Sequence, residues 1–249
     1  MADRSQRGDV LLQVAINGGR TRTEHPAIPV TPEQQAGEAA AAVTAGAGAI
    51  HVHVRGSDGR ESLAWNDVAR ALEAIRKACP GTAVGISTGA SIVGEAGRRL
   101  SLVRGWRVLP DFASVNVHEE GAIELIKLLL DREVGVEAGV WNGRAAQTLQ
   151  GSGLANKCLR VLIEPAEDGG DARRNIDAIE AALGQAAPSR LLHGLDASAW
   201  EFLALAAERG YDTRTGLEDT LRLPDGSVAE NNAALVVAAL RIVSKVALP

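Results

Sequence analysis

The sequence predicts an α/β protein built as a single (βα)8 barrel, often called a TIM barrel, over residues 1–249. Three observations lead to this fold. Short apolar runs rich in β-branched residues alternate with longer helical patterns eight times along the chain. Such alternation indicates parallel strands with helical crossovers, and eight pairs in 249 residues suit a closed barrel better than an open sheet. No linker or low-complexity tract divides the chain, so we expect one domain.

Eight strands are expected where the apolar runs lie. They cover residues 10–16, 50–54, 83–87, 112–117, 134–140, 159–163, 191–193 and 213–217. In a barrel of this kind, reactive side chains lie at the carboxyl ends of the strands and in the loops that follow. This rule selects which polar residues deserve a functional interpretation.

Eight helices are expected between and after the strands. They cover residues 31–44, 66–78, 93–106, 122–130, 144–154, 171–183, 197–209 and 232–245. The first has the clearest start, because Thr31 is a good N-cap, Pro32 suits the first turn and Gln34 completes a capping box. Gly46 ends this helix, and Pro80 follows the end of the second.

Composition and charge argue against certain classes of binding partner and cellular location. The formal net charge is −5 and the basic residues are scattered, which argues against nucleic acid or an anionic membrane as partner. Residues 1–8 contain no apolar signal core, and no apolar run reaches the roughly 18 residues of a membrane span. Cys79 and Cys158 form no Cys-x-x-Cys pair, so we expect two buried thiols in a reducing compartment, the cytoplasm.

The strongest functional signal is a pair of histidines at the end of the second expected strand. His51 and His53 are two residues apart, so on a strand both imidazoles point to the same face and can converge on one ion. Imidazole nitrogen suits zinc, copper, iron or nickel. The alternative is two unrelated polar side chains, each of which would need its own buried partner.

A third ligand is expected, because catalytic zinc usually takes three protein ligands and leaves one position open. Glu218 and Asp219 follow the last expected strand. Adjacent residues point to different sides, so one can bind the metal while the other acts as a base or orients one. The alternative is an acidic pair that caps a helix in a solvated loop.

Other polar residues follow the strands as candidate substrate contacts. Ser87 and Thr88 end the third strand, and Ser114 and Asn116 share one face of the fourth. Each also has a structural interpretation, as part of an ordinary turn. Arg20 and Arg22 follow the first strand, where an arginine can bind a carboxylate with paired hydrogen bonds or can simply be solvated. Glu137 and Glu164 are candidates to orient a ligand histidine from behind.

These residues together resemble the β-keto acid cleavage enzymes, the family that includes 3-keto-5-aminohexanoate cleavage enzyme. The resemblance covers nearly the whole chain and rests on segments in the family's order: residues 29–33, 51–55, 86–89, 113–116, 214–219 and 229–233. The His-x-His-x-Arg motif at residues 51–55 and the Arg-x-Gly-x-Glu-Asp motif of the last strand are fairly specific in combination.

The resemblance implies a zinc-dependent barrel, commonly a homotetramer, that acts on a β-keto acid with acetyl-CoA as co-substrate. It implies that His51, His53 and Glu218 are the metal ligands. Ser87, Ser114 and Asn116 match substrate-contacting positions, and Arg214 and Asp219 match the proton-abstracting machinery. The products in that family are acetoacetate and a new acyl-CoA.

The implied chemistry suits the residues. A metal polarises the keto oxygen, a base removes an α-proton, and the resulting carbon nucleophile attacks the thioester before a retro-Claisen step breaks the carbon–carbon bond. Because an arginine is normally protonated, we expect Asp219 to be the final proton acceptor and Arg214 to position it.

Several positions depart from the family pattern. Members that act on amino-substituted keto acids carry an acidic residue where this chain has Arg20, so we expect a keto acid with a neutral or anionic side chain, such as a dicarboxylate. The family's second glutamate of strand five is Gly139 here, and strand six ends in Ile163-Glu164-Pro165 instead of a glycine-rich segment. Two alternatives therefore stay open: a metal-dependent hydrolase or lyase that does not use CoA, and a non-catalytic binding barrel or an iron enzyme.

Overall fold

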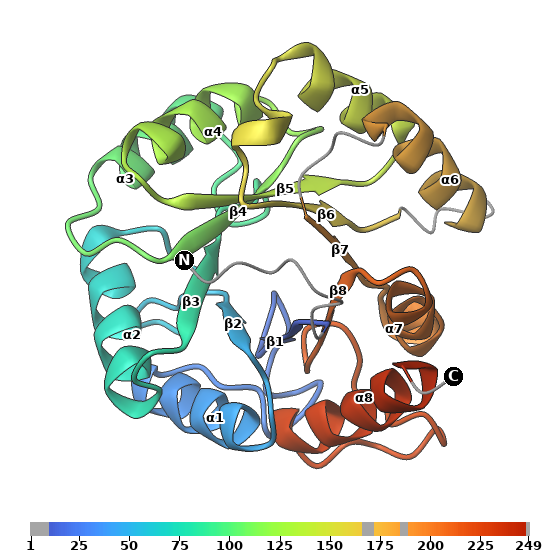
Figure 1. Ribbon diagram of the computed structural model, residues 1–249. Coiled ribbons are helices and arrows are strands. Elements are labelled where there is room, and N and C mark those ends of the chain that lie inside the picture. The colour runs from blue at the N-terminus through green and yellow to red at the C-terminus, as the bar shows by residue number, and fades with distance from the viewer. Residues whose placement is uncertain (1–9, 166–171, 185–188, 248–249) are drawn as a thin grey trace.

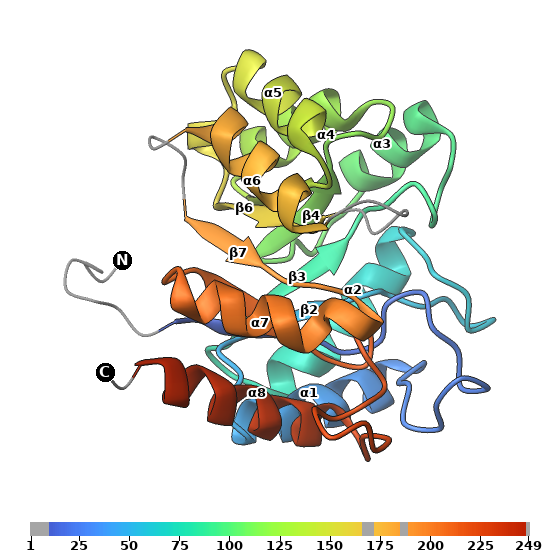
Figure 2. The ribbon, with the colours of Figure 1, turned by 90° about the vertical axis from the view of Figure 1, so that its right-hand side faces the viewer.

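Eight parallel strands close into one barrel in this computed structural model, which describes residues 10–165, 172–184 and 189–247. The strands follow one another around the barrel in chain order, and pairing of β8 with β1 closes the ring. Helices α1 to α8 surround the strands, as Figure 1 shows in the view along the barrel. Figure 2 shows α7 and α8, which contact each other, side by side on one flank. The predicted fold class is confirmed.

The strands are shorter than the apolar runs that predicted them. Their bounds are β1 (Leu12–Ala15), β2 (Ala49–Val52), β3 (Ala83–Ser87), β4 (Phe112–Asn116), β5 (Gly135–Val140), β6 (Arg160–Ile163), β7 (Arg190–Leu192) and β8 (Asp212–Thr215). Two of the differences matter for the site, because His53 lies just after β2 and Glu218 lies in the loop after β8. Both were expected to lie within or directly at the end of a strand.

The helices agree with the expected ones apart from their ends. Their bounds are α1 (Pro32–Thr44), α2 (Trp65–Ala78), α3 (Ala96–Arg104), α4 (Ala122–Asp131), α5 (Gly143–Gly151), α6 (Ala172–Leu183), α7 (Ala199–Glu208) and α8 (Asn232–Ala247). The expected capping box of α1 is present between Thr31 and Gln34. Helix α3 starts later than expected because the carboxylate of Glu95 caps the backbone N–H groups of Gly97 and Arg98. The expected start of the sixth helix, residue 171, lies outside the described residues.

The core is aliphatic, as the low aromatic content required. Residues such as Val14, Ile50, Ile86 and Val136 are fully buried, and side chains of both strands and helices join one continuous cluster. Both cysteines are free and buried, as expected. Within the described residues, no helix is long and apolar enough to cross a membrane.

Candidate active site

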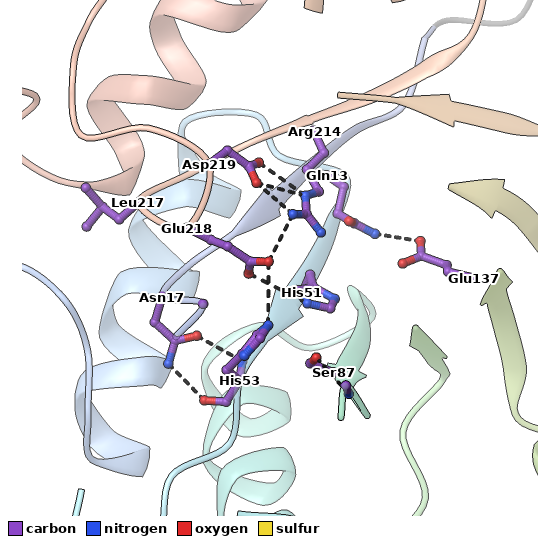
Figure 3. Close-up of polar contacts among 12 residues, drawn as sticks. Gln13, Asn17, His51, His53, Ser87, Glu137, Arg214, Leu217, Glu218 and Asp219 are labelled. Atoms are coloured by element: carbon purple, nitrogen blue, oxygen red, sulfur yellow. Dashed lines mark hydrogen bonds and ion pairs between the residues drawn. The ribbon is translucent and has the colours of Figure 1, made fainter. Parts of the chain in front are cut away.

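Two histidines and one glutamate meet at the carboxyl end of the barrel, although they come from opposite ends of the chain. The Nε2 atom of His51 lies 3.7 Å from Glu218 Oε2, and the Nε2 atom of His53 lies 3.5 Å from Glu218 Oε1. One candidate ligand atom from each side chain lies within 4.8 Å of the other two. Figure 3 shows the three side chains pointing toward one another. The structure thus brings together the three residues expected to bind a metal.

The donor set fits a divalent metal such as zinc. Two imidazole nitrogens and one carboxylate are a common ligand set for catalytic zinc, with a fourth position open. Ligand atoms about 2.1 Å from a tetrahedral zinc ion lie roughly 3.4 Å apart, close to the separations between Glu218 and the two histidines. The Glu218 Oε2 atom is buried and has no hydrogen-bond partner among the described residues, so its lone pairs are available to an ion.

Close backbone approach places Glu218 in this site. The chain leaves β8 at Gly216, whose φ of 154° brings it against β1, and an added Cβ would lie 2.0 Å from the carbonyl oxygen of Ala15. The Glu218 side chain then passes over Gly18, where an added Cβ would lie 2.5 Å from Glu218 Cγ. Glycine at both positions is therefore required by space as well as by backbone conformation.

Side chains from neighbouring loops hold the backbone of His53. The Asn17 Oδ1 atom accepts a hydrogen bond from the His53 N–H at 2.9 Å, and the Asn17 amide donates to the His53 carbonyl at 2.9 Å. The Gln35 amide donates to the same carbonyl at 3.2 Å. Just beyond β2 these side-chain hydrogen bonds take the place of the backbone hydrogen bonds between strands. They fix the backbone of His53 and therefore the direction in which its imidazole points. Asn17 and Gln35 were not among the expected functional residues.

Glu61 orients the His53 ring. Its carboxylate is hydrogen-bonded to His53 Nδ1, which leaves Nε2 directed at Glu218. A carboxylate behind a ligand histidine raises the basicity of the imidazole and sets its tautomer. Glu137 and Glu164 were the candidates for this role, and neither is paired with His51 or His53 among the described residues; Glu164 lies beside His193 instead. Glu137 lies inside the barrel against Gln13 and Arg160.

Glu61 was missed because it comes from the loop after β2, eight residues beyond His53 in the sequence. An isolated antiparallel bridge between Arg55 and Glu61 folds that loop back on itself. Sequence spacing alone does not show this return. Arg55 holds the facing loop by donating to the carbonyl oxygens of Gly18 and Arg20, which explains why the histidine pair is followed by an arginine.

Arg214 and Asp219 form a buried ion pair beside His51, His53 and Glu218. The guanidinium contacts both carboxylate oxygens of Asp219, with Nη2 2.7 Å from Oδ1 and Nε 3.1 Å from Oδ2. The same Nη2 atom lies 2.9 Å from Glu218 Oε1. Arg214 therefore bridges the two adjacent carboxylates, and of the two only Glu218 is in contact with the histidines. Adjacent residues were expected to point to different sides, and the two acids nevertheless share Arg214 as a partner.

The histidines differ in protonation because their surroundings differ. Burial lowers the pKa of His51 to about 3, despite the opposing charge of Glu218. Burial acts in the same direction on His53, but the carboxylates of Glu218 and Glu61 outweigh it and raise its pKa to about 9. Burial opposes ionisation of Glu218, yet Arg214 and His53 hold its pKa well below the ordinary value. Burial raises the pKa of Asp219 against the effect of Arg214, so this carboxylate has the greater affinity for a proton.

This difference predicts that metal binding competes with a proton on His53. Below a pKa of about 9 the metal must displace that proton, whereas His51 is already neutral. The affinity of the metal-free protein for zinc should therefore rise about tenfold per pH unit between pH 7 and pH 9. Competition with a chromophoric chelator at several pH values measures this slope. Glu61→Gln should move the upper end of the slope to lower pH, and an affinity that stays constant over this range contradicts the prediction.

The expected substrate contacts divide into two groups. Ser87 and Ser114 lie opposite each other on β3 and β4 and are slightly accessible, at 7% and 8% exposure. No hydrogen bond of the Ser114 hydroxyl is found among the described residues, so this hydroxyl is available to a ligand. Thr88 differs, because its hydroxyl donates to the Ser114 carbonyl at 2.6 Å and so links the two strands. Asn116 donates to Glu119 Oε1 at 2.9 Å, and its amide oxygen remains available.

Arg20 lies against the loop that carries Glu218, but two carboxylates partly neutralise its charge. Its Nε atom donates to the Glu218 carbonyl at 3.1 Å, while Nη2 lies 2.6 Å from Asp196 Oδ1 and Nη1 lies 3.7 Å from Glu24 Oε1. Arg22 is exposed. Of the two arginines after β1, Arg20 is therefore the one anchored at the site.

Comparison with known proteins relates this geometry to an enzyme family. A sequence profile described as beta-keto acid cleavage enzyme matches residues 9–249. A 3-keto-5-aminohexanoate cleavage enzyme from Fusobacterium nucleatum is 26% identical over 250 residues, which covers 94% of this chain and 90% of the relative. A 3-oxoadipate:acetyl-CoA acetyltransferase from Cupriavidus necator is 41% identical over 108 residues, covering 42% of this chain and 36% of that protein.

Among solved structures, the apo structure of ObcA has the same fold. It superposes with a TM-score of 0.65 at 18% identity and covers 87% of this chain and 61% of its own. Identity this low supports the barrel alone. The profile match over nearly the whole sequence identifies this chain as a member of the beta-keto acid cleavage enzyme family.

Proposed function

We propose that this protein is a zinc-dependent enzyme that transfers the acyl group of a β-keto acid to CoA, using acetyl-CoA as co-substrate. A β-keto acid R–CO–CH2–COO⁻ and acetyl-CoA would give acetoacetate and R–CO–S–CoA. The observation that carries the proposal is the position of the Arg214–Asp219 pair, which contacts the carboxylate of the His51–His53–Glu218 set. Family membership supports the reaction class.

Asp219 and Arg214 would remove the α-proton of the keto acid. Burial opposes the charge of Arg214, but the carboxylates of Asp219 and Glu218 outweigh it and raise the pKa of the guanidinium, so it stays cationic. A cation is a poor base but can pass on a proton. Arg214 can transfer an N–H proton to Asp219 as it receives the substrate proton, which leaves Arg214 unchanged and Asp219 protonated.

The other residues of the site would bind the keto acid and acetyl-CoA next to each other. His51, His53 and Glu218 would bind the metal, which supplies polarisation of the keto carbonyl when it is present. The hydroxyls of Ser87 and Ser114 and the amide oxygen of Asn116 would contact the keto acid or the thioester at the mouth of the barrel. We omit Thr88 from these contacts because its hydroxyl proton is committed to the β4 backbone.

The preferred keto acid is proposed to carry a neutral or anionic side chain. Arg20 is anchored to the backbone of Glu218, which places a cation beside the proposed metal site. The Cupriavidus necator relative supports this, since 3-oxoadipate carries a second carboxylate at its far end. A dicarboxylate is therefore the first class of substrate to test.

Reversal of the charge at Arg20 should reverse this preference. Arg20→Glu is expected to lower kcat/KM for 3-oxoadipate about tenfold and to raise it for an amino-substituted keto acid. The effect is modest because Asp196 and Glu24 already balance part of the charge of Arg20. Kinetics of both substrates with both proteins measure the change. Arg22→Glu, at an exposed position, is the matched control, and an equal loss in both variants contradicts a specific role for Arg20.

The proposed function is tested by a screen of β-keto acids with acetyl-CoA and the zinc-loaded protein. We expect acetoacetate and a new acyl-CoA to appear in equal amounts, with 3-oxoadipate among the active substrates. Consumption of the keto acid at the same rate without acetyl-CoA overturns the transferase proposal and identifies a metal-dependent hydrolase or lyase. Metal analysis of the purified protein distinguishes zinc from iron.

The assembly and location are part of the same proposal. By resemblance to the family we propose a homotetramer in the cytoplasm, which acts on small molecules and has no nucleic-acid or membrane partner. The scattered charge of the chain supports the last point. Light scattering during size-exclusion chromatography measures the subunit number.

A further inference from the structure

A histidine that the proposed reaction does not use lies buried beside Asp219. His193 follows β7 directly and is fully buried, with 0% exposure. Its Nδ1 atom lies 3.5 Å from Asp219 Oδ1, and its Nε2 atom lies 3.2 Å from Glu164 Oε2. Both contacts are ion-pair distances, and neither ring nitrogen has a hydrogen-bond partner among the described residues. The imidazole therefore joins two carboxylates that come from the ends of different strands.

Glu164 links this histidine to the mouth of the barrel. It follows β6 directly, its N–H donates to the Val140 carbonyl at 3.1 Å, and its side chain is 17% exposed. Burial opposes its ionisation, but the neighbouring imidazole of His193 lowers the pKa of Glu164, so it is ionised at neutral pH. Glu164 therefore presents an acceptor to the ring nitrogen that faces away from Asp219.

We propose that Glu164 and His193 are positioning residues for Asp219, forming one continuous chain Glu164–His193–Asp219–Arg214. This rests on the proposed function, in which Asp219 is the final proton acceptor. The Arg214 guanidinium donates hydrogen bonds to Asp219, and the His193 ring lies 3.5 Å from the same carboxylate oxygen, so Asp219 is enclosed between the guanidinium and the imidazole. Without His193, Asp219 Oδ1 loses a close polar neighbour in a buried site, which favours rotation away from the proton-transfer geometry.

The position of Glu164 also bears on Gly139, which stands where the family pattern has a second glutamate on the fifth strand. Strand five has Gly139, and an added Cβ there would lie 2.7 Å from Asn116 Oδ1, so the space above this position is occupied by the asparagine. Glu164 directly follows β6, the strand that pairs with β5. Glu164 therefore supplies a carboxylate to the mouth of the barrel, whereas β5 has a glycine at position 139.

The closing experiment is a double-mutant cycle between His193 and Asp219. The readout is exchange of the keto acid α-protons in D2O, followed by NMR on zinc-loaded protein without acetyl-CoA. His193→Ala and Glu164→Gln should lower the exchange rate about 10- to 100-fold while zinc content and KM for the keto acid stay within about threefold. In the Asp219→Asn background, His193→Ala should cause no further loss, because its effect acts through Asp219.

Two outcomes of this cycle overturn the proposal. One is an equal loss from His193→Ala in both backgrounds. The other is a parallel change in zinc content, KM and melting temperature, which indicates a structural role. A second measurement does not depend on turnover. In the wild-type protein we expect a low-field NMR resonance from the imidazole N–H of His193, and this resonance should be lost in Glu164→Gln. Its absence in the wild type overturns the proposal even without turnover. If α-protons exchange but acetoacetate does not form from acetyl-CoA, the proposed function fails while the role of His193 is still tested.

Discussion

Replacement of His51 with alanine should abolish zinc binding and lower kcat/KM for cleavage by a factor of about a thousand or more. The His51 side chain is buried, neutral and directed at Glu218, so no neighbouring group replaces its nitrogen. Polarisation of a carbonyl by a metal contributes several kcal/mol to transition-state stabilisation, and each 1.36 kcal/mol corresponds to about a tenfold change in rate. Metal analysis after dialysis and steady-state kinetics measure both effects.

The fold must be monitored in the same experiment, because loss of a buried side chain leaves a cavity. Glu218→Gln offers a second route to the same result, since it keeps the volume of the side chain and removes the negative charge. Circular dichroism should show the barrel intact in both variants. A His51→Ala protein that retains one zinc per chain and its activity would remove this site as the metal centre.

Asp219→Asn should lower kcat by a factor of about 100 to 10,000 while zinc remains bound. General acid–base groups contribute this range of rate acceleration. The amide keeps one oxygen for the Arg214 guanidinium but cannot accept a proton at neutral pH, so the proton-transfer step should fail while the ligands His51, His53 and Glu218 remain in place. Acetoacetate formation and α-proton exchange in D2O measure the loss, and metal analysis measures the retained zinc.

A matched control distinguishes catalysis from stability. Removal of one charge from a buried ion pair destabilises a protein, so the melting temperature of Asp219→Asn should also fall. Asp131→Asn, at an exposed residue at the end of α4, makes the same chemical change far from the barrel mouth and should leave activity unchanged. Full turnover by a zinc-loaded Asp219→Asn protein contradicts the assignment of Asp219 as proton acceptor.

The barrel could be predicted because its periodicity is local. Each strand is a short apolar run and each helix begins and ends with residues that have local preferences, as Thr31 and Gln34 show in the capping box of α1. The convergence of the three proposed metal ligands could be predicted for a related reason. In a barrel the carboxyl ends of all strands lie at one edge, so His51 and Glu218 are brought together by topology, whatever their separation in sequence.

The supporting groups could not be predicted because loops determine them. The hydrogen bond that Glu61 accepts from His53 depends on a loop that folds back after β2, and the two hydrogen bonds between Asn17 and the His53 backbone depend on the path of the loop after β1. Glu137 has a different explanation, because it lies on a strand as expected. Its side chain points into the barrel interior, where Arg160 provides the partner that a buried carboxylate requires.

The sequence by itself therefore determined the closed barrel, the pair of histidines and the acidic pair after the last strand, since each follows from residue type and spacing along one element. Only the tertiary structure decided which groups surround them: that Arg214 contacts both acids, that Thr88 is committed to a neighbouring strand, and that His193 lies between two carboxylates. The physical reason is that side-chain hydrogen bonds join atoms within about 3 Å in space, and in a closed barrel the nearest partner belongs to another strand or loop of the chain.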